Sequence, residues 1–333
     1  MTLRFGLLGA GRIGKVHARA ISATAGASLV AVADAMAPAA KAIADLYGCE
    51  VRSVDAILAA KDIDAVVICT PTDTHADLIE AFAKAGKAIF CEKPIDLSLS
   101  RVKACLKVVR DTKAVLMVGF NRRFDPHFRA VKAAIADGTL GHVEMVTITS
   151  RDPGPPPMDY IARSGGIFRD MTIHDFDMAR FLLGEEVAEV SAMAAVLVDP
   201  AIGKAGDSDS VQVMLKTASG KMCLISNSRR ATYGYDQRIE VHGSLGAASA
   251  ENQRPVMIEV ATAKGYNRPP LHDFFMTRYT EAYAAEIASF IAAASGKGKV
   301  SPSGEDGLSA LALAEAALKS VAEGRTVKMS EVL

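Results

Sequence analysis

The sequence predicts an α/β domain with a doubly wound parallel sheet, followed by an α+β domain with a mostly antiparallel open sheet and helices on one face. Before residue 120, short runs rich in Val, Ile and Leu alternate with Ala-rich stretches of helical spacing. Such strands, apolar throughout and separated by helices, indicate a parallel sheet covered on both faces. After residue 120, strand-like runs follow one another without long helices between them. The expected domains are 1–120 and 121–333.

The elements of the first domain follow in regular order. The apolar runs have strand length, and the stretches between them have the length of about three helical turns. The expected strands are 4–9, 29–34, 64–70, 87–91 and 115–120, and the expected helices are 13–24, 38–47, 74–85 and 98–112.

The second domain begins with a helix, a strand and a loop that contains four prolines, which lack the backbone donor of a regular element. A helix that ends at Gly184 and a series of strands follow, two of them joined by the hairpin turn 218–220. The expected helices are 126–137, 169–183, 273–295 and 305–323, the loop is 152–157, and the strands are 142–151, 187–198, 209–217, 221–228, 236–243 and 256–262.

Composition excludes several classes of function. Lys and Arg number 38, as do Asp and Glu, so the formal net charge of zero argues against nucleic-acid binding through phosphates. The five cysteines show no C-x-x-C spacing, which indicates neither a zinc site nor a redox motif, and Cys69 and Cys91 are expected to be buried, inert thiols. No apolar run reaches about 18 residues, and no signal peptide precedes the first strand, so a cytoplasmic protein without a membrane span is expected.

Residues 9–14 read G-x-G-x-x-G, with Gly9, Gly11 and Gly14 directly after a predicted strand and at the start of a predicted helix. The glycines permit a tight turn and close approach of a pyrophosphate, and the helix N-terminus attracts its negative charge. Asp34 ends the second strand, where its carboxylate can accept hydrogen bonds from a ribose. The pattern predicts a Rossmann domain that prefers NAD, because a 2′-phosphate would meet the charge of Asp34. The alternative is a glycine turn in another α/β fold.

Two further loops follow strands at the same edge of the predicted sheet. Thr70-Pro71-Thr72-Asp73-Thr74-His75 follows the third strand, where ligands of open α/β sheets bind. It has an alternative interpretation as a helix cap followed by an exposed histidine. Glu92-Lys93-Pro94 follows the fourth strand, and the proline holds Lys93 extended. The alternative interpretation is that Lys93 is an ordinary surface lysine. A cis peptide bond at Pro94 would fix the direction in which Lys93 points.

In the second domain, Asp170 and His174 are four residues apart, and on one helix they would share a face. A carboxylate can hold an imidazole in one tautomer and stabilise its protonated form. Such a pair is also common as a purely structural feature.

These segments together resemble the Gfo/Idh/MocA oxidoreductase family over nearly the whole chain. The resemblance rests on GAGRIG at 9–14, Asp34, CTPTDTH at 69–75, CEKP at 91–94, GFNRRFD at 119–125 and DMTIHDFDMARFLLG at 170–184. Within the family, 150–181 and 227–243 are most similar to inositol 2-dehydrogenases. The resemblance implies NAD-dependent oxidation of myo-inositol to 2-keto-myo-inositol (scyllo-inosose).

The resemblance also implies residue roles. Lys93 would contact both substrate and nicotinamide, His174 would act as the general base, and Asp170 would orient it and bind the polyol. Asp152, Tyr160 and Tyr233 are further expected substrate contacts. The residues expected at the cofactor, besides Gly9, Gly11, Gly14, Asp34 and Lys93, are Arg12, Ile13, Thr70, Pro71, Thr72, His75, Glu92 and Arg122. No metal is expected, because the Lys93 ammonium can stabilise alkoxide charge.

Two other functions stay open at this point. The same fold and mechanism would serve scyllo-inositol or an aldose. A non-catalytic dinucleotide-sensing protein would keep the glycines and Asp34, but it would have no reason to combine Lys93, Asp170 and His174. The resemblance further implies a homotetramer formed through the open sheet, whose apolar strands, such as 190–198, predict a covered face.

Overall fold

The computed structural model describes residues 2–333, which form two compact units. Of the described residues, unit 1 comprises 2–124 and 280–311, and unit 2 comprises 125–279 and 312–333. The chain therefore returns to unit 1 after it leaves unit 2, which a simple division at residue 120 does not describe. The proposed division of function between 1–120 and 121–333 stays a prediction.

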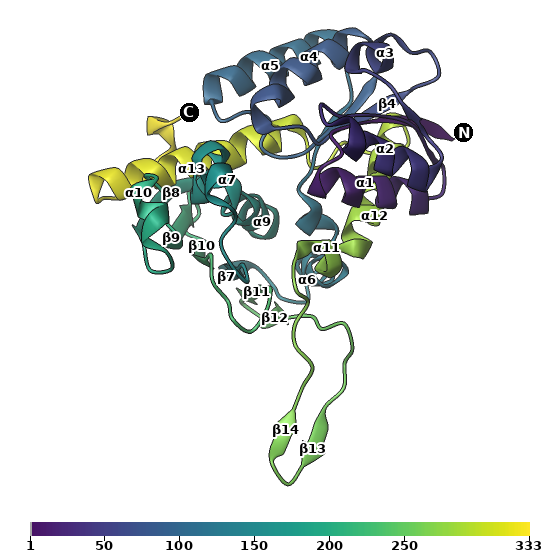
Figure 1. Ribbon diagram of the computed structural model, residues 1–333. Helices are drawn as coiled ribbons and strands as arrows, with labels where there is room; N and C mark the ends of the chain where they lie inside the picture. The colour runs from purple at the N-terminus through teal and green to yellow at the C-terminus, as the bar shows by residue number, and fades with distance from the viewer. Residues whose placement is uncertain (1) are drawn as a thin grey trace. The chain divides into compact units, whose positions relative to one another are not determined.

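Unit 1 is built on a six-stranded parallel sheet in the order β3-β2-β1-β4-β5-β6 (Figure 1). Apolar side chains that are almost fully buried fill its central strands, as expected for a sheet covered on both faces. The strands are β1 (Leu3–Leu8), β2 (Ala27–Ala33), β3 (Glu50–Val51), β4 (Ala65–Ile68), β5 (Ala88–Cys91) and β6 (Leu116–Val118). The order reverses between β1 and β4, which is where ligands of such sheets bind.

Helices cover the two faces of this sheet. On one face α12 packs through Phe290, whose ring lies 6.0 Å from that of Phe5 and 5.8 Å from that of Phe90. The helices are α1 (Arg12–Ala23), α2 (Ala37–Tyr47), α3 (Val54–Ala59), α4 (His75–Lys84), α5 (Leu99–Thr112) and α12 (Thr280–Ala294), with short 3₁₀ turns η1 (Thr72–Thr74) and η2 (Asn121–Phe124). The sequence predicts a helix at 273–295 as part of the second domain, but α12 belongs to unit 1.

Unit 2 contains a seven-stranded sheet in the order β12-β11-β7-β10-β9-β8-β15. All neighbouring pairs are antiparallel except β10 and β7, so the expected mostly antiparallel sheet is confirmed. Its strands are β7 (Val143–Arg151), β8 (Val187–Ala195), β9 (Ser210–Thr217), β10 (Met222–Ser228), β11 (Asp236–Gly243), β12 (Gly246–Ala250) and β15 (Val327–Lys328). The hairpin expected at 218–220 joins β9 to β10.

The helices of unit 2 include one correction to the expected structure. A single helix over 169–183 is wrong, because the chain turns at 171–172 between α8 and α9. The helices are α6 (Pro126–Ala136), α7 (Met158–Ser164), α8 (Ile167–Asp170), α9 (Ile173–Leu183), α10 (Pro200–Lys204) and α11 (Phe275–Arg278), and α13 (Gly304–Glu323) crosses the boundary between the units. The 3₁₀ turn η3 (Met329–Glu331) follows β15.

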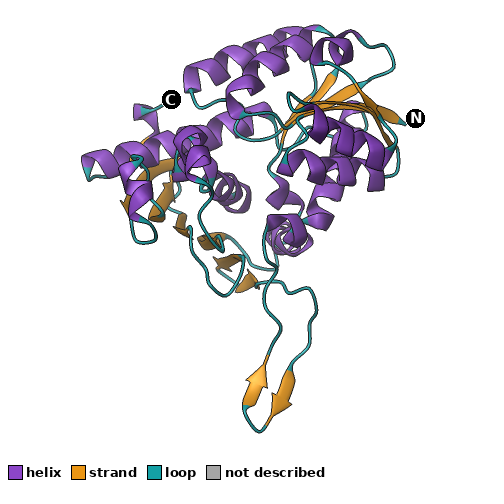
Figure 2. Cartoon of the chain, in the orientation of Figure 1, coloured by secondary structure: helices purple, strands orange, loops and turns teal. Residues whose placement is uncertain are grey.

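A hairpin arm projects from the rest of unit 2 (Figure 2). Its strands are β13 (Val260–Thr262) and β14 (Gly265–Asn267), which pair only with each other. The expected sheet strand at 256–262 is therefore wrong. The segment 256–262 is rich in apolar residues, but every residue of the two short strands is exposed.

Candidate functional site

The glycine loop of unit 1 has the shape that a bound dinucleotide requires. Gly9 has φ +95°, and a Cβ there would lie 2.5 Å from the Cys69 carbonyl oxygen. A Cβ at Gly14 would lie 2.0 Å from the Gly9 carbonyl oxygen, whereas a Cβ at Gly11 would meet nothing within 4 Å. Two glycines thus allow the close packing of β1, β4 and α1, and the middle one leaves open space for a pyrophosphate.

Asp34 follows β2 and is bound to this loop. Its Oδ2 accepts a hydrogen bond from the Ala10 amide at 2.5 Å, and its Oδ1 accepts one from the Met36 amide at 2.7 Å. The carboxylate is half-buried, and each oxygen retains acceptor capacity for a ribose hydroxyl. The glycine loop and Asp34 therefore fit NAD.

The loop after β4 is held by its own side chains. Thr70 Oγ1 and Thr74 Oγ1 are 2.6 Å apart, and Thr74 Oγ1 donates to the Pro71 carbonyl at 2.7 Å. Pro71 is exposed and Thr72 half-buried, so the loop is accessible at the carboxyl edge of the sheet. The alternative of an exposed His75 is wrong, because its side chain lies in the interior and only 2% of the residue is exposed.

His75 joins two of the expected cofactor loops. Its Nε2 lies 2.8 Å from the Thr70 carbonyl oxygen, and its Nδ1 lies 2.8 Å from the Pro94 carbonyl oxygen. Both ring nitrogens are thus engaged by main-chain oxygens. His75 contributes to this edge of the sheet by holding the loops together.

Glu92, Lys93 and Pro94 follow β5 at the same edge. Glu92 is buried and Lys93 half-buried, and the Lys93–Pro94 peptide bond is cis. Glu92 Oε1 lies 2.6 Å from Nε2 of His17, a fully buried residue of α1 that sequence reasoning missed. Its position three residues after Gly14 on the buried face of α1 was the available signal.

The other expected cofactor residues differ in exposure. Arg12 is exposed and Ile13 half-buried at the start of α1, beside the open space at Gly11. Arg122 lies in η2, after β6, with only 5% of its surface exposed. Unit 1 thus brings the expected residues to the carboxyl ends of β1, β2, β4, β5 and β6.

In unit 2, Asp170 is the last residue of α8 and is held by two neighbours. Tyr160 Oη donates to Asp170 Oδ1 at 2.8 Å, and two guanidinium nitrogens of Arg229 lie 3.4 Å from Oδ2. Arg229 is 1% exposed and also lies 3.6 Å from Asp207. The structure therefore brings Tyr160 and Asp170 into direct contact, and it adds Arg229, a residue that sequence reasoning missed.

His174 is the second residue of α9 and is half-buried. The start of its helix is anchored to the sheet by a buried polar network. Asp175 accepts hydrogen bonds from Ser150 Oγ at 2.6 Å and from Asn227 Nδ2 at 2.8 Å, and Thr172 Oγ1 donates to Asn227 Oδ1 at 2.7 Å. Ser150 and Asn227 are register partners on β7 and β10. The network fixes the turn that carries His174.

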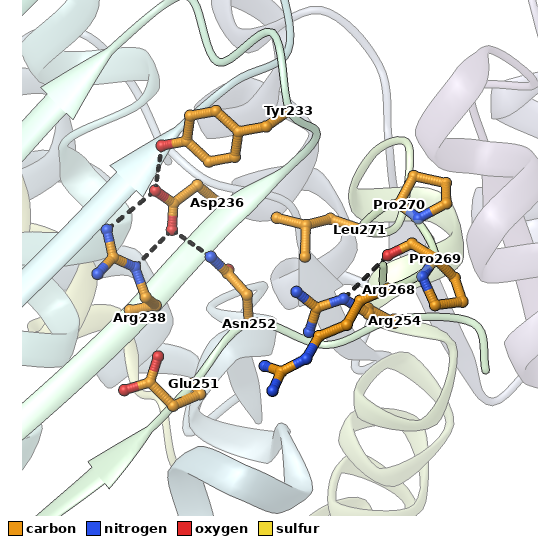
Figure 3. A pocket seen from close by; sticks show the side chains of 10 residues that line it. All are labelled: Tyr233, Asp236, Arg238, Glu251, Asn252, Arg254, Arg268, Pro269, Pro270 and Leu271. Carbon is orange, nitrogen blue, oxygen red and sulfur yellow. Dashed lines mark hydrogen bonds and ion pairs between the residues drawn. The ribbon is translucent and has the colours of Figure 1, made fainter. Parts of the chain in front are cut away.

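Tyr233 lines a pocket of about 890 Å³ in unit 2 (Figure 3). Its hydroxyl donates to Asp236 Oδ2 at 2.5 Å and accepts from Arg151 at 3.1 Å. Asp236 also accepts hydrogen bonds from Arg238 at 2.8 Å and Asn252 at 2.6 Å. The described lining of this pocket contains neither Asp170 nor His174.

The environment shifts the pKa values of Tyr233 and Asp236. Burial and the hydrogen bond to Asp236 raise the pKa of Tyr233. Burial alone would raise the pKa of Asp236, but the hydrogen bonds from Arg238, Tyr233 and Asn252 outweigh it and lower the pKa. Asp236 is therefore a carboxylate at neutral pH.

The other substrate-side expectation is Asp152, which follows β7 and is half-buried. Its amide donates to the Ser228 carbonyl at 3.0 Å, which fixes the start of the proline loop against β10. The loop 152–157 is irregular, as expected.

Cys69 and Cys91 are buried as expected, and burial raises the pKa of both thiols. Within residues 2–333, no cluster of three or more His, Cys, Asp or Glu side chains has an arrangement suited to a metal ion. In the same range, none of the helices combines the length and the apolar character that a bilayer span requires.

Models of known protein families match both halves of the chain. Residues 3–120 match the model of the oxidoreductase family with an NAD-binding Rossmann fold, and 128–249 match the GFO/IDH/MocA C-terminal domain. The chain is 76% identical over 330 residues to an inositol 2-dehydrogenase of Rhizobium meliloti (strain 1021), covering 99% of this chain and 100% of that one.

Two solved structures are similar over almost the full length. A myo-inositol dehydrogenase of Corynebacterium glutamicum ATCC 13032 has a TM-score of 0.94 at 46% identity, covering 98% of this chain and 99% of that one. A scyllo-inositol dehydrogenase of Lactobacillus casei with bound NAD(H) and scyllo-inositol has a TM-score of 0.92 at 28% identity, covering 99% and 100%. With its glycine loop and Asp34 shaped for NAD, the chain belongs to the Gfo/Idh/MocA family of NAD-dependent oxidoreductases.

Proposed function

We propose that this enzyme oxidises myo-inositol to 2-keto-myo-inositol with NAD. The observation that carries the proposal is the 76% identity, over 330 residues, to a protein named inositol 2-dehydrogenase. The polar side chains of unit 2 support it. Asp170, Tyr160 and Arg229 form a hydrogen-bonded group of the kind that recognises a polyol, a ligand with many hydroxyls and no charge.

In the proposed reaction, NAD supplies the acceptor for the hydride that leaves the alcohol carbon. His174, as the general base, takes the proton of the reacting hydroxyl. The Lys93 ammonium stabilises the negative charge that develops on the oxygen. The proposal therefore requires that Lys93 and His174 meet at one substrate carbon.

Asp170 has a supporting role in this mechanism. Its carboxylate, held by Tyr160 and Arg229, would orient His174 and accept hydrogen bonds from the ring hydroxyls. Asp152 and Tyr233 stay proposed substrate contacts. For Tyr233 this requires that substrate reach the cavity beside Asp236.

Scyllo-inositol is the second candidate substrate, because the similar Lactobacillus casei structure holds it together with NAD(H). Steady-state NADH formation with myo-inositol, scyllo-inositol and glucose, measured in parallel with NAD and NADP, tests both. We expect the highest kcat/KM with myo-inositol and NAD. Turnover of glucose without turnover of any inositol would overturn the proposal.

We also infer a homotetramer. One face of the unit 2 sheet exposes large apolar side chains on adjacent strands, and Met145 is the register partner of Met222, as Met214 is of Leu224. Met193 on β8 is 77% exposed. A sheet face of this kind is typical of a covered interface. Light scattering should give four times the mass of one chain, and a monomer mass would contradict the inference.

A further inference from the structure

Lys93 lies between two residues that are each held by a buried histidine of unit 1. On one side, Glu92 Oε1 lies 2.6 Å from Nε2 of His17. On the other side, the Pro94 carbonyl oxygen lies 2.8 Å from Nδ1 of His75. The two histidines are 0% and 2% exposed, so both contacts lie in the protein interior.

Each histidine comes from an element that also forms the cofactor edge. His17 is on α1, the helix that the glycine loop opens, and His75 is the first residue of α4. The second ring nitrogen of His75 lies 2.8 Å from the Thr70 carbonyl oxygen, in the loop after β4. Each imidazole therefore ties the Glu92-Lys93-Pro94 segment to a different cofactor-binding segment.

The His17–Glu92 contact has little freedom to move. The His17 ring lies 5.0 Å from that of Phe90 and 5.4 Å from that of Tyr283. A Cβ at Gly119 would lie 3.0 Å from the carboxyl carbon of Glu92, so this side chain packs closely against position 119. The Glu92 amide also donates to the Ile68 carbonyl at 3.0 Å.

We propose that His17 and His75 form a clamp on both sides of Lys93 that fixes the lysine relative to the bound cofactor. They are positioning residues, since they act on the main chain and on Glu92. The inference rests on the proposed role of Lys93 in the reaction. It predicts that loosening the clamp slows the chemical step more than it weakens substrate binding.

The experiment compares His17→Leu and His75→Leu with His17→Gln and His75→Gln in the full-length enzyme. Leucine removes the ring nitrogens, whereas glutamine retains an NH2 group that can donate hydrogen bonds. Lys87→Met is the matched control, because buried Lys87 donates to the carbonyls of Ala60 at 2.6 Å and Ile63 at 2.9 Å, next to the opposite ends of the strands. The readouts are kcat, KM for myo-inositol, NADH affinity by fluorescence, and amide hydrogen exchange of the protein without cofactor.

We expect kcat to fall about tenfold to a hundredfold in the leucine variants, with KM within about threefold, and the glutamine variants to recover part of the loss. Amide exchange should accelerate over 91–95. Lys87→Met should instead accelerate exchange around 60–64 and keep kcat within about twofold. Leucine variants with wild-type kcat, or with unchanged exchange over 91–95, would overturn the clamp. Failure of the proposed function is a separate result, namely a wild-type enzyme that forms no NADH with inositols.

Discussion

The cofactor edge of unit 1 and the polar group of unit 2 are built in different ways. At the cofactor edge, strand ends and glycines place the main chain, and Asp34 is fixed by two amides close to it in space. In unit 2, Asp170 is held by Tyr160, ten residues away, and by Arg229, 59 residues away. Main-chain contacts thus hold Asp34 at the cofactor edge, whereas side-chain contacts hold Asp170 in unit 2.

The largest effect should come from removing the two residues that the proposed reaction needs, one from each unit. We expect His174→Ala to lower kcat roughly 10²-fold to 10⁴-fold, because the general base is lost. Lys93→Ala should cost about 10²-fold to 10³-fold through lost charge stabilisation. Steady-state assays of NADH formation with myo-inositol measure kcat for both variants. Wild-type turnover in both variants would show that the reaction needs neither Lys93 nor His174.

The glycine loop offers a sharper test of the cofactor edge. Gly14→Ala should destabilise unit 1, since the new methyl would lie 2.0 Å from the Gly9 carbonyl oxygen. Gly11→Ala should leave the melting temperature unchanged, because φ at Gly11 is −70° and its Cβ meets nothing within 4 Å. The Gly11→Ala methyl should nevertheless weaken NADH binding about tenfold or more by filling the space for the pyrophosphate. Equal NADH affinity in Gly11→Ala and wild type would contradict this.

A substitution of Arg229 tests whether this side chain positions Asp170. Arg229→Met should lower the free energy of unfolding by about 3 kcal/mol, because Asp170 and Asp207 lose a buried partner. Turnover should fall as well, with NADH affinity unchanged, since the glycine loop and Asp34 belong to unit 1. Chemical denaturation and NADH fluorescence report the two quantities. A variant that is as stable and as active as wild type would mean that Arg229 does not position Asp170.

The smallest effect concerns pH. The folded-state pKa of Asp236 is lowered, so its ionised form contributes stability above the unfolded value of about 3.9. That contribution is lost as the pH falls through the lower folded-state value. Asp236→Asn should therefore be less stable than wild type at pH 7, and the difference should shrink below about pH 4. A difference that is constant from pH 7 to pH 3 would exclude this linkage.

The same contrast explains what the sequence could predict. The glycine motif and Asp34 were readable because a short spacing pattern marks them: three glycines lie within residues 9–14, and an acid follows 20 residues after the last of them. The turn between α8 and α9 was not, because Asp207 accepts from the Ile167 amide and Asn227 accepts from Thr172, both from distant segments. His17 had a signal in the sequence, because it is a histidine on the buried face of α1. Arg229 had no such signal.

The most direct test of the central claim is a crystal structure of the enzyme with NADH and myo-inositol. In that structure, Lys93 Nζ and a ring nitrogen of His174 should both lie within hydrogen-bond distance of one inositol hydroxyl, on the carbon that faces C4 of the nicotinamide. An inositol that contacts only one of these two residues, or neither, would contradict it.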